Sequence, residues 1–132
     1  MILDIFTKLL DANIPGCEWR WSSNEHTSVV ISPTWPEFGE IEVEDDGDEL
    51  MVFFGKFTHS HFSNYEGALS LEQREERIAA DLVQLLQEVF ADRIEFYGSS
   101  KGGGGFRPRG MRGTLSKLGF GNKAYVWSGQ VS

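Results

Sequence analysis

The sequence predicts an α+β fold in which two helices pack on one face of a mainly antiparallel sheet of about five to six strands. Three observations support this class. Helical periodicity occurs in two segments, near the N-terminus and over residues 71–90. A hairpin signal joins two strands directly within residues 39–62. The regular strand–helix alternation of a doubly wound fold is absent from the sequence, so a parallel sheet is not expected.

The first elements follow from apolar spacing and from turn residues. Apolar side chains recur every three or four positions between Ile2 and Leu10, which predicts a short helix that ends near Asn13. Alternation over residues 18–21 predicts a strand, and a β-branched run over residues 26–32 predicts the next strand.

The clearest local signal is the hairpin, whose turn pair is Asp46-Gly47. With these two residues as the loop, Val43 lies opposite Leu50, and the apolar residues of both strands share one face. The same register sets Glu44 opposite Glu49, a mildly repulsive pair, so a bulge or a shifted register remains open.

The later elements are predicted from a capping box and from the strands that follow it. Ser70 and Gln73 have the spacing of a capping box, which begins a helix that runs to about Phe90. Strands are predicted over residues 93–97 and 123–127.

The length and composition indicate a single domain over residues 1–132. The longest apolar run falls short of the roughly 18–20 residues that span a bilayer, and the first residues lack the pattern of a signal peptide. Cys17 is the one cysteine, so no internal disulfide is expected. We therefore expect a soluble, cytoplasmic protein without membrane contact.

Charge is divided unevenly along the chain. The formal net charge is −8, from 20 acidic and 12 basic residues. Residues 1–97 hold every acidic residue and half of the bases, and residues 98–132 hold the other six bases. Such asymmetry points to interaction surfaces, although the basic segment could instead fold back on the acidic body.

The hairpin concentrates carboxylates and forms the first candidate binding surface. Seven carboxylates lie on it, Glu49 among them, and the candidate binding residues are Glu40, Glu42, Glu44, Asp45, Asp46 and Asp48. One interpretation is a docking surface for a basic partner, and the other is a charged edge that prevents pairing with other chains. An EF-hand is excluded, because Phe53 stands where the bidentate glutamate is required.

The second candidate surface is a long Gly-rich connection over residues 98–122, which precedes the last strand. Connections of this length are usually functional or mobile. The glycine spacing fits neither a P-loop nor a dinucleotide fingerprint. Arginines beside one aromatic residue resemble the arginine–glycine segments of RNA-binding proteins, which implies anion binding with stacking on a base. The candidate residues are Lys101, Phe106, Arg107, Arg109 and Arg112.

The sequence contains no recognisable catalytic set. His59 and His61 point the same way on a strand and could form a metal pair, but no third ligand is close in sequence. Cys17 is expected to be an incidental or buried thiol. We therefore assign no catalytic residue, no metal ligand and no cofactor.

The function expected from these patterns is that of a binding module that contacts another macromolecule. The outline is that of an inhibitor or immunity-type protein, and a protein partner is expected, a basic one if it uses the hairpin. Two alternatives stay open: weak binding of nucleic acid or another anion through the arginine–glycine segment, and a histidine-based enzyme or metal site.

Overall fold

The computed structural model describes residues 2–47, 49–55, 57–99, 103–109 and 125–130, and the structural statements below concern these residues. Within them the chain forms two helices, a short 3₁₀ turn and nine strands. In chain order the elements are α1 (Ile2–Asn13), β1 (Trp19–Trp21), β2 (Ser28–Ile31), η1 (Pro36–Phe38), β3 (Ile41–Asp45), β4 (Leu50–Phe54), β5 (Thr58–Phe62), α2 (Leu71–Phe90), β6 (Ile94–Ser99), β7 (Gly103–Pro108), β8 (Tyr125–Val126) and β9 (Gly129–Gln130).

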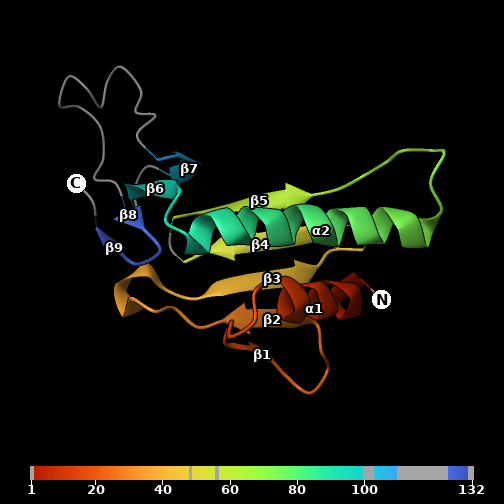
Figure 1. Cartoon of the computed structure of the whole chain (residues 1–132), viewed down its shortest axis with the longest axis horizontal. Helices are drawn as coiled ribbons and strands as arrows, with labels where there is room; N and C mark the ends of the chain where they lie inside the picture. The colour runs from red at the N-terminus through yellow and green to blue at the C-terminus, as the bar shows by residue number, and fades with distance from the viewer. Residues whose placement is uncertain (1, 48, 56, 100–102, 110–124, 131–132) are drawn as a thin grey trace.

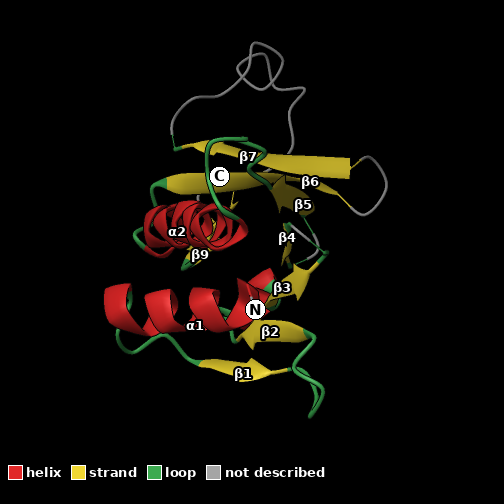
Figure 2. Cartoon of the chain, turned by 90° about the vertical axis from the view of Figure 1, so that its right-hand side faces the viewer, coloured by secondary structure: helices red, strands yellow, loops and turns green. Residues whose placement is uncertain are grey.

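The strands form two antiparallel sheets. The larger sheet contains β1 to β5 in chain order, and the smaller sheet has the order β7-β6-β8-β9. Helices α1 and α2 lie next to each other on one face of the larger sheet (Figures 1 and 2). The predicted α+β class is confirmed, with mainly antiparallel pairing and two helices on one face. The strands beyond the predicted five to six are β5 in the larger sheet and β7 and β9 in the smaller sheet.

Helix α2 begins where the capping box predicts. The Ser70 hydroxyl accepts a hydrogen bond from the Gln73 backbone N–H at 3.1 Å, and the Gln73 side-chain oxygen accepts one from the Ser70 N–H at 3.0 Å. Both helices bury one apolar face, which in α1 includes Phe6 and Leu10. Neither helix of the described chain combines the length and apolarity that crossing a membrane requires.

The core lies between the helices and the inner face of the larger sheet, which is the face toward the helices. The fully buried side chains of this face include Val43, Val52 and Phe54. The smaller sheet joins the same core, because the Phe96 ring lies 5.1 Å from the Phe54 ring and 5.0 Å from the Phe38 ring. Aromatic pairs at these distances contribute beyond the area that they bury.

The register of the β3–β4 hairpin differs from the predicted one by two residues. Val43 pairs with Val52 in place of Leu50, and Glu44 pairs with Met51 in place of Glu49. The reason is the position of the turn: the Asp46 N–H donates to the Glu49 carbonyl at 2.9 Å, so this pair closes the hairpin. Because the shift is even, the buried and outward faces stay as predicted. Glu44 and Glu49 are not cross-strand partners, so the repulsion expected from that pairing does not apply.

The sequence predicts a long connection over residues 98–122, and this prediction is wrong for part of that segment. Strand β7 lies within it and pairs with β6 over six residue pairs, from Ile94 with Pro108 to Ser99 with Gly103. Glycine suits this strand because a Cβ at Gly105 would lie 2.6 Å from the Tyr97 hydroxyl oxygen. Residues 100–102 and 110–122 lie outside the described residues.

Strands β6 and β7 hold a buried ion pair. Glu95 and Arg107 are cross-strand partners, and the Arg107 Nη2 lies 3.5 Å from the Glu95 Oε2. The Glu95 side chain is 2% exposed and the Arg107 side chain 16%. The guanidinium also lies over the Tyr97 ring, at 4.6 Å from its centroid. The negative charge of Glu95 is therefore balanced inside the fold by one base of the basic segment.

We predict that Glu95→Ala destabilises the fold by about 3–5 kcal/mol, because it leaves the buried Arg107 charge without its counterion. Urea unfolding measures the change. The control is Arg77→Ala, because Arg77 and Glu66 form a surface pair whose side chains are 59% and 58% exposed, and breaking such a pair costs less than about 1 kcal/mol. Equal losses in the two variants would contradict the structural role of the buried pair.

Candidate functional site

The outer face of the larger sheet is the face opposite the helices, and it carries the first candidate site. Alternate residues of the five strands share this face because side chains alternate along a strand. Strand pairing arranges them in two rows. One row runs Arg20, Val30, Glu42, Phe53 and His59 across the five strands. The other row runs Ser28, Glu44, Met51 and His61 across β2 to β5.

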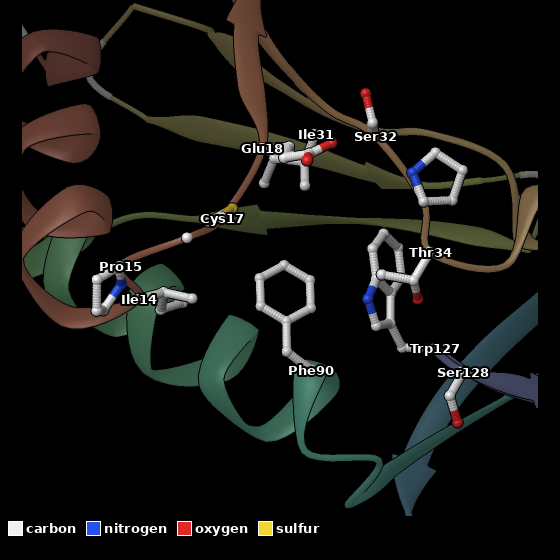
Figure 3. A pocket seen from close by; sticks show the side chains of 12 residues that line it. Ile14, Pro15, Cys17, Glu18, Ile31, Ser32, Thr34, Phe90, Trp127 and Ser128 are labelled. Carbon is white, nitrogen blue, oxygen red and sulfur yellow. The ribbon is translucent and has the colours of Figure 1, made fainter.

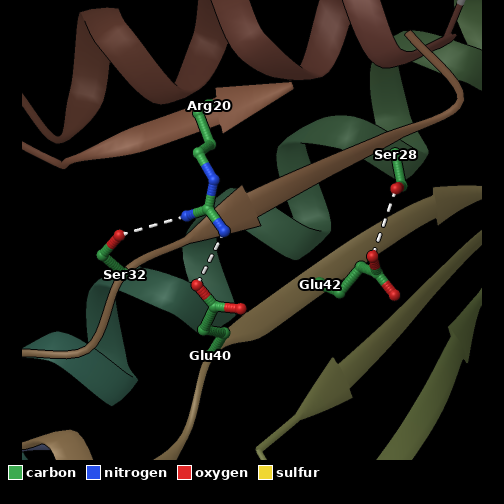
Figure 4. Close-up of polar contacts among 5 residues, drawn as sticks. All are labelled: Arg20, Ser28, Ser32, Glu40 and Glu42. Atoms are coloured by element: carbon green, nitrogen blue, oxygen red, sulfur yellow. Dashed lines mark hydrogen bonds and ion pairs between the residues drawn. The ribbon is translucent and has the colours of Figure 1, made fainter. Parts of the chain in front are cut away.

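Four carboxylates occur at every second position along β3 and its two ends: Glu40, Glu42, Glu44 and Asp46. We call them the acidic row. The Arg20 guanidinium donates to Glu40 at 2.8 Å, and the Ser28 hydroxyl donates to Glu42 at 3.2 Å (Figure 4). Among the described residues, no base forms an ion pair with Glu42 or Glu44. Within the described part of the chain, no base therefore balances the carboxylates at the centre of the acidic row.

Two of the predicted hairpin residues do not belong to the acidic row. Asp45 has the opposite alternation and pairs with Leu50. Asp48 lies outside the described residues. The predicted acidic surface is therefore represented on the outer face by four of its six candidates.

Apolar side chains lie beside the acidic row on the neighbouring strand. Met51 and Phe53 are half-buried and are the cross-strand partners of Glu44 and Glu42. The Phe53 ring lies 5.7 Å from the His59 ring on the next strand. The outer face thus combines a negatively charged strand with a partly apolar one.

Crowding of carboxylates affects the protonation of Glu44. Partial burial, and after it the charge of Glu42, a hydrogen bond with Glu42 and the charge of Asp46, raise the pKa of Glu44 above its ordinary value of 4.5. A positive group from a partner would relieve this repulsion.

The second candidate surface, the arginine–glycine segment, is divided by strand β7. Phe106 packs against the core, with its ring 5.5 Å from Phe54, and Arg107 pairs with Glu95. Arg109 is exposed, and its backbone N–H donates to the Arg93 carbonyl at 2.9 Å. Lys101 and Arg112 lie outside the described residues. In the described part, the structure does not bring the aromatic ring and the arginines together on one open surface.

The two histidines of β5 lie in different surroundings. The His59 and His61 rings are 6.2 Å apart and nearly perpendicular. His61 lies beside Glu49, with its Nδ1 3.4 Å from the Glu49 Oε2. Spacing in the sequence does not indicate this neighbour, because Glu49 is distant from His61 along the chain and is brought close by the pairing of Met51 with His61.

A cavity of about 470 Å³ lies between the end of α1, the end of β2 and the end of α2 (Figure 3). Phe90 and Trp127 face it, with ring centroids 5.0 Å apart. Cys17 also lines it. Partial burial, followed by the charges of Asp11 and Glu18, raises the pKa of the Cys17 thiol to about 11. This thiol is therefore protonated near neutral pH and is a poor nucleophile.

We predict that Glu44→Gln stabilises the fold at neutral pH by up to about 1 kcal/mol, because it removes repulsion between neighbouring carboxylates. The raised pKa means that the folded chain binds this proton more tightly than the unfolded chain. The destabilising effect of ionised Glu44 is hence present above the raised pKa and disappears as the pH falls below 4.5.

Thermal unfolding of Glu44→Gln at neutral pH and below pH 4.5 measures this effect. Glu76→Gln is the control, since Glu76 is exposed on α2. A lower melting temperature for Glu44→Gln at neutral pH would show that Glu44 is not under repulsion.

We predict that Cys17 reacts slowly with a thiol reagent such as Ellman's reagent. With a pKa of about 11 in place of the ordinary 9.0, the thiolate fraction at mildly alkaline pH is lower by roughly 100-fold. The control is the same chain unfolded in guanidinium chloride, where the ordinary rate should return. Equal rates in the folded and unfolded chain would contradict the raised pKa.

Comparison of the chain with protein-family models, with curated proteins and with solved structures finds no match.

Proposed function

We propose that this chain is a protein-binding module whose outer face covers a basic surface of a partner protein. The observation that carries the proposal is the acidic row, whose central members Glu42 and Glu44 have no ion-pair partner among the described residues. They lie directly beside Met51 and Phe53, which are half-buried.

The spacing of the acidic row fits a basic protein surface. Alternate residues of a strand are roughly 7 Å apart, so the row extends over roughly 20 Å. Lysine and arginine side chains of a partner could pair with it at several points. Complementary charge of this kind speeds association and excludes acidic partners.

The apolar side chains on the outer face of β4 favour a protein as the partner over a simple polyanion or a simple cation. Stable interfaces have an apolar centre with aromatic residues and methionine, surrounded by polar groups. Phe53 and Met51 supply such a centre, and the acidic row supplies the polar border on the β3 side. Phe53 is the residue that we expect to contribute most, because large aromatic side chains are enriched at interaction hot spots.

The partner class follows from the same charge. A small chain of net charge −8 that presents carboxylates is suited to an inhibitor or immunity-type role, in which it covers a basic toxin or nuclease. A nucleic acid is a less favourable partner for this face, because phosphates are repelled by the acidic row. Phe106 and Arg107 give the alternative of nucleic-acid binding less support, since both have partners inside the fold.

The test is affinity capture from the native cell after nuclease treatment, followed by calorimetry with the purified partner. Glu42→Lys with Glu44→Lys should lower the affinity at least about tenfold, because it places like charges at the interface. Phe53→Ala should lower it by a similar factor.

The matched control is Glu76→Lys with Asp81→Lys, which changes the net charge equally on the exposed side of α2. This control should leave the affinity within about twofold. If both charge reversals weaken binding equally, the binding depends on total charge and the outer face is not the interface. If neither weakens it, the proposal is wrong.

A further inference from the structure

A mixed cluster of one imidazole and two carboxylates lies where the hairpin meets β5, on the outer face. Asp46, Glu49 and His61 each offer one ligand atom, and these atoms all lie within 4.8 Å of one another. Asp46 and His61 are exposed, and Glu49 is half-buried. Asp46 and Glu49 lie in the turn that joins β3 to β4, and His61 lies in β5.

The backbone holds these three positions together. The Asp46 N–H donates to the Glu49 carbonyl at 2.9 Å, which fixes the two carboxylates across the hairpin turn. The pairing of Met51 with His61 sets His61 diagonally across from Glu49 on the next strand. Diagonal neighbours on a sheet are within reach of long side chains. The cluster is therefore built by strand register, and it does not depend on a chance approach of loops.

The distances fit a small divalent ion. A tetrahedral zinc ion bound to nitrogen and oxygen holds its ligand atoms roughly 3.4 Å apart, and the His61 Nδ1 lies 3.4 Å from the Glu49 Oε2. A carboxylate oxygen of Asp46 lies within 4.8 Å of one ligand atom of each of the other two residues.

The Glu49 carboxylate is oriented by a second contact. The Tyr65 hydroxyl donates to its Oε1, which leaves the Oε2 toward His61. A hydrogen bond from outside the ligand set commonly orients a metal-binding carboxylate. His59, two residues before His61 on the same strand, does not belong to this cluster.

We propose that Asp46, Glu49 and His61 bind a divalent transition-metal ion, for which Zn²⁺ is the probe. The donor set determines the class: an imidazole nitrogen with two carboxylate oxygens suits zinc and its neighbours, whereas Ca²⁺ and Mg²⁺ prefer oxygen ligands only. Three protein ligands leave room for water or for a donor group from another molecule. Asp46 also belongs to the acidic row, but the proposal does not rest on the protein-binding role, which is tested by variants of Glu42, Glu44 and Phe53, so the two proposals can fail separately.

The test is calorimetric titration of the untagged full chain with zinc chloride. We expect one equivalent to bind, with an affinity at least about tenfold lower in His61→Ala, as is usual when a ligand is removed. His59→Ala is the matched control, because it removes an exposed histidine from the same face of the same strand, and its affinity should equal that of the unchanged chain. Excess Mg²⁺ should not compete.

A second variant, Asp46→Asn, and a second measurement, the melting temperature, test the same zinc site independently. Asp46→Asn should also weaken binding, and zinc should raise the melting temperature of the unchanged chain but not of His61→Ala. Absence of binding in the unchanged chain would overturn the proposal. So would an equal loss in His59→Ala and His61→Ala, which would show binding to surface histidines in general.

Discussion

The packing of Phe96 against Phe38 and Phe54 is the interaction on which the rest of this structure depends. It joins the smaller sheet to the core of the larger one, with ring centroids 5.0 and 5.1 Å apart. The helices also cover the inner face of the larger sheet (Figure 2). These elements bury their apolar side chains against the inner face of the larger sheet. The side chains of the outer face, which include the acidic row, are therefore not required to form the core.

Much of the fold follows from local sequence signals. Ser70 and Gln73 begin α2 as a capping box predicts, and the alternation around Val43 correctly assigns the faces of the hairpin. The predicted register is wrong by two residues, because the turn residues allow more than one pair to close the hairpin. The predicted faces are right, because they depend only on the alternation of side chains along a strand. The sequence predicts a connection where β7 lies, because glycine disfavours strands locally. The contact of β7 with Tyr97, which needs a residue without a side chain at Gly105, is a tertiary effect that local propensity does not contain.

The candidate site was predicted in part. Carboxylates at alternate positions are visible in the sequence, so the acidic row could be predicted. The side chains that lie next to the acidic row could not be predicted, because the cross-strand partners of Glu42 and His61 depend on strand register. The division of charge along the chain has two interpretations. Arg107 pairs with Glu95, as expected if the basic segment folds back on the acidic body, and the use of the acidic row as an interaction surface stays a prediction.

The chain-order arrangement of β1 to β5 also has a consequence for how the molecule reaches its native state. Each strand of this meander pairs with the strand that directly precedes or follows it. Such pairing closes short loops, which lowers the entropy that must be lost before contacts form. In the smaller sheet, β6 also pairs with β8, which is distant in sequence, through Phe96 and Tyr125. The meander and the β6–β7 hairpin should therefore form before β8 pairs with β6.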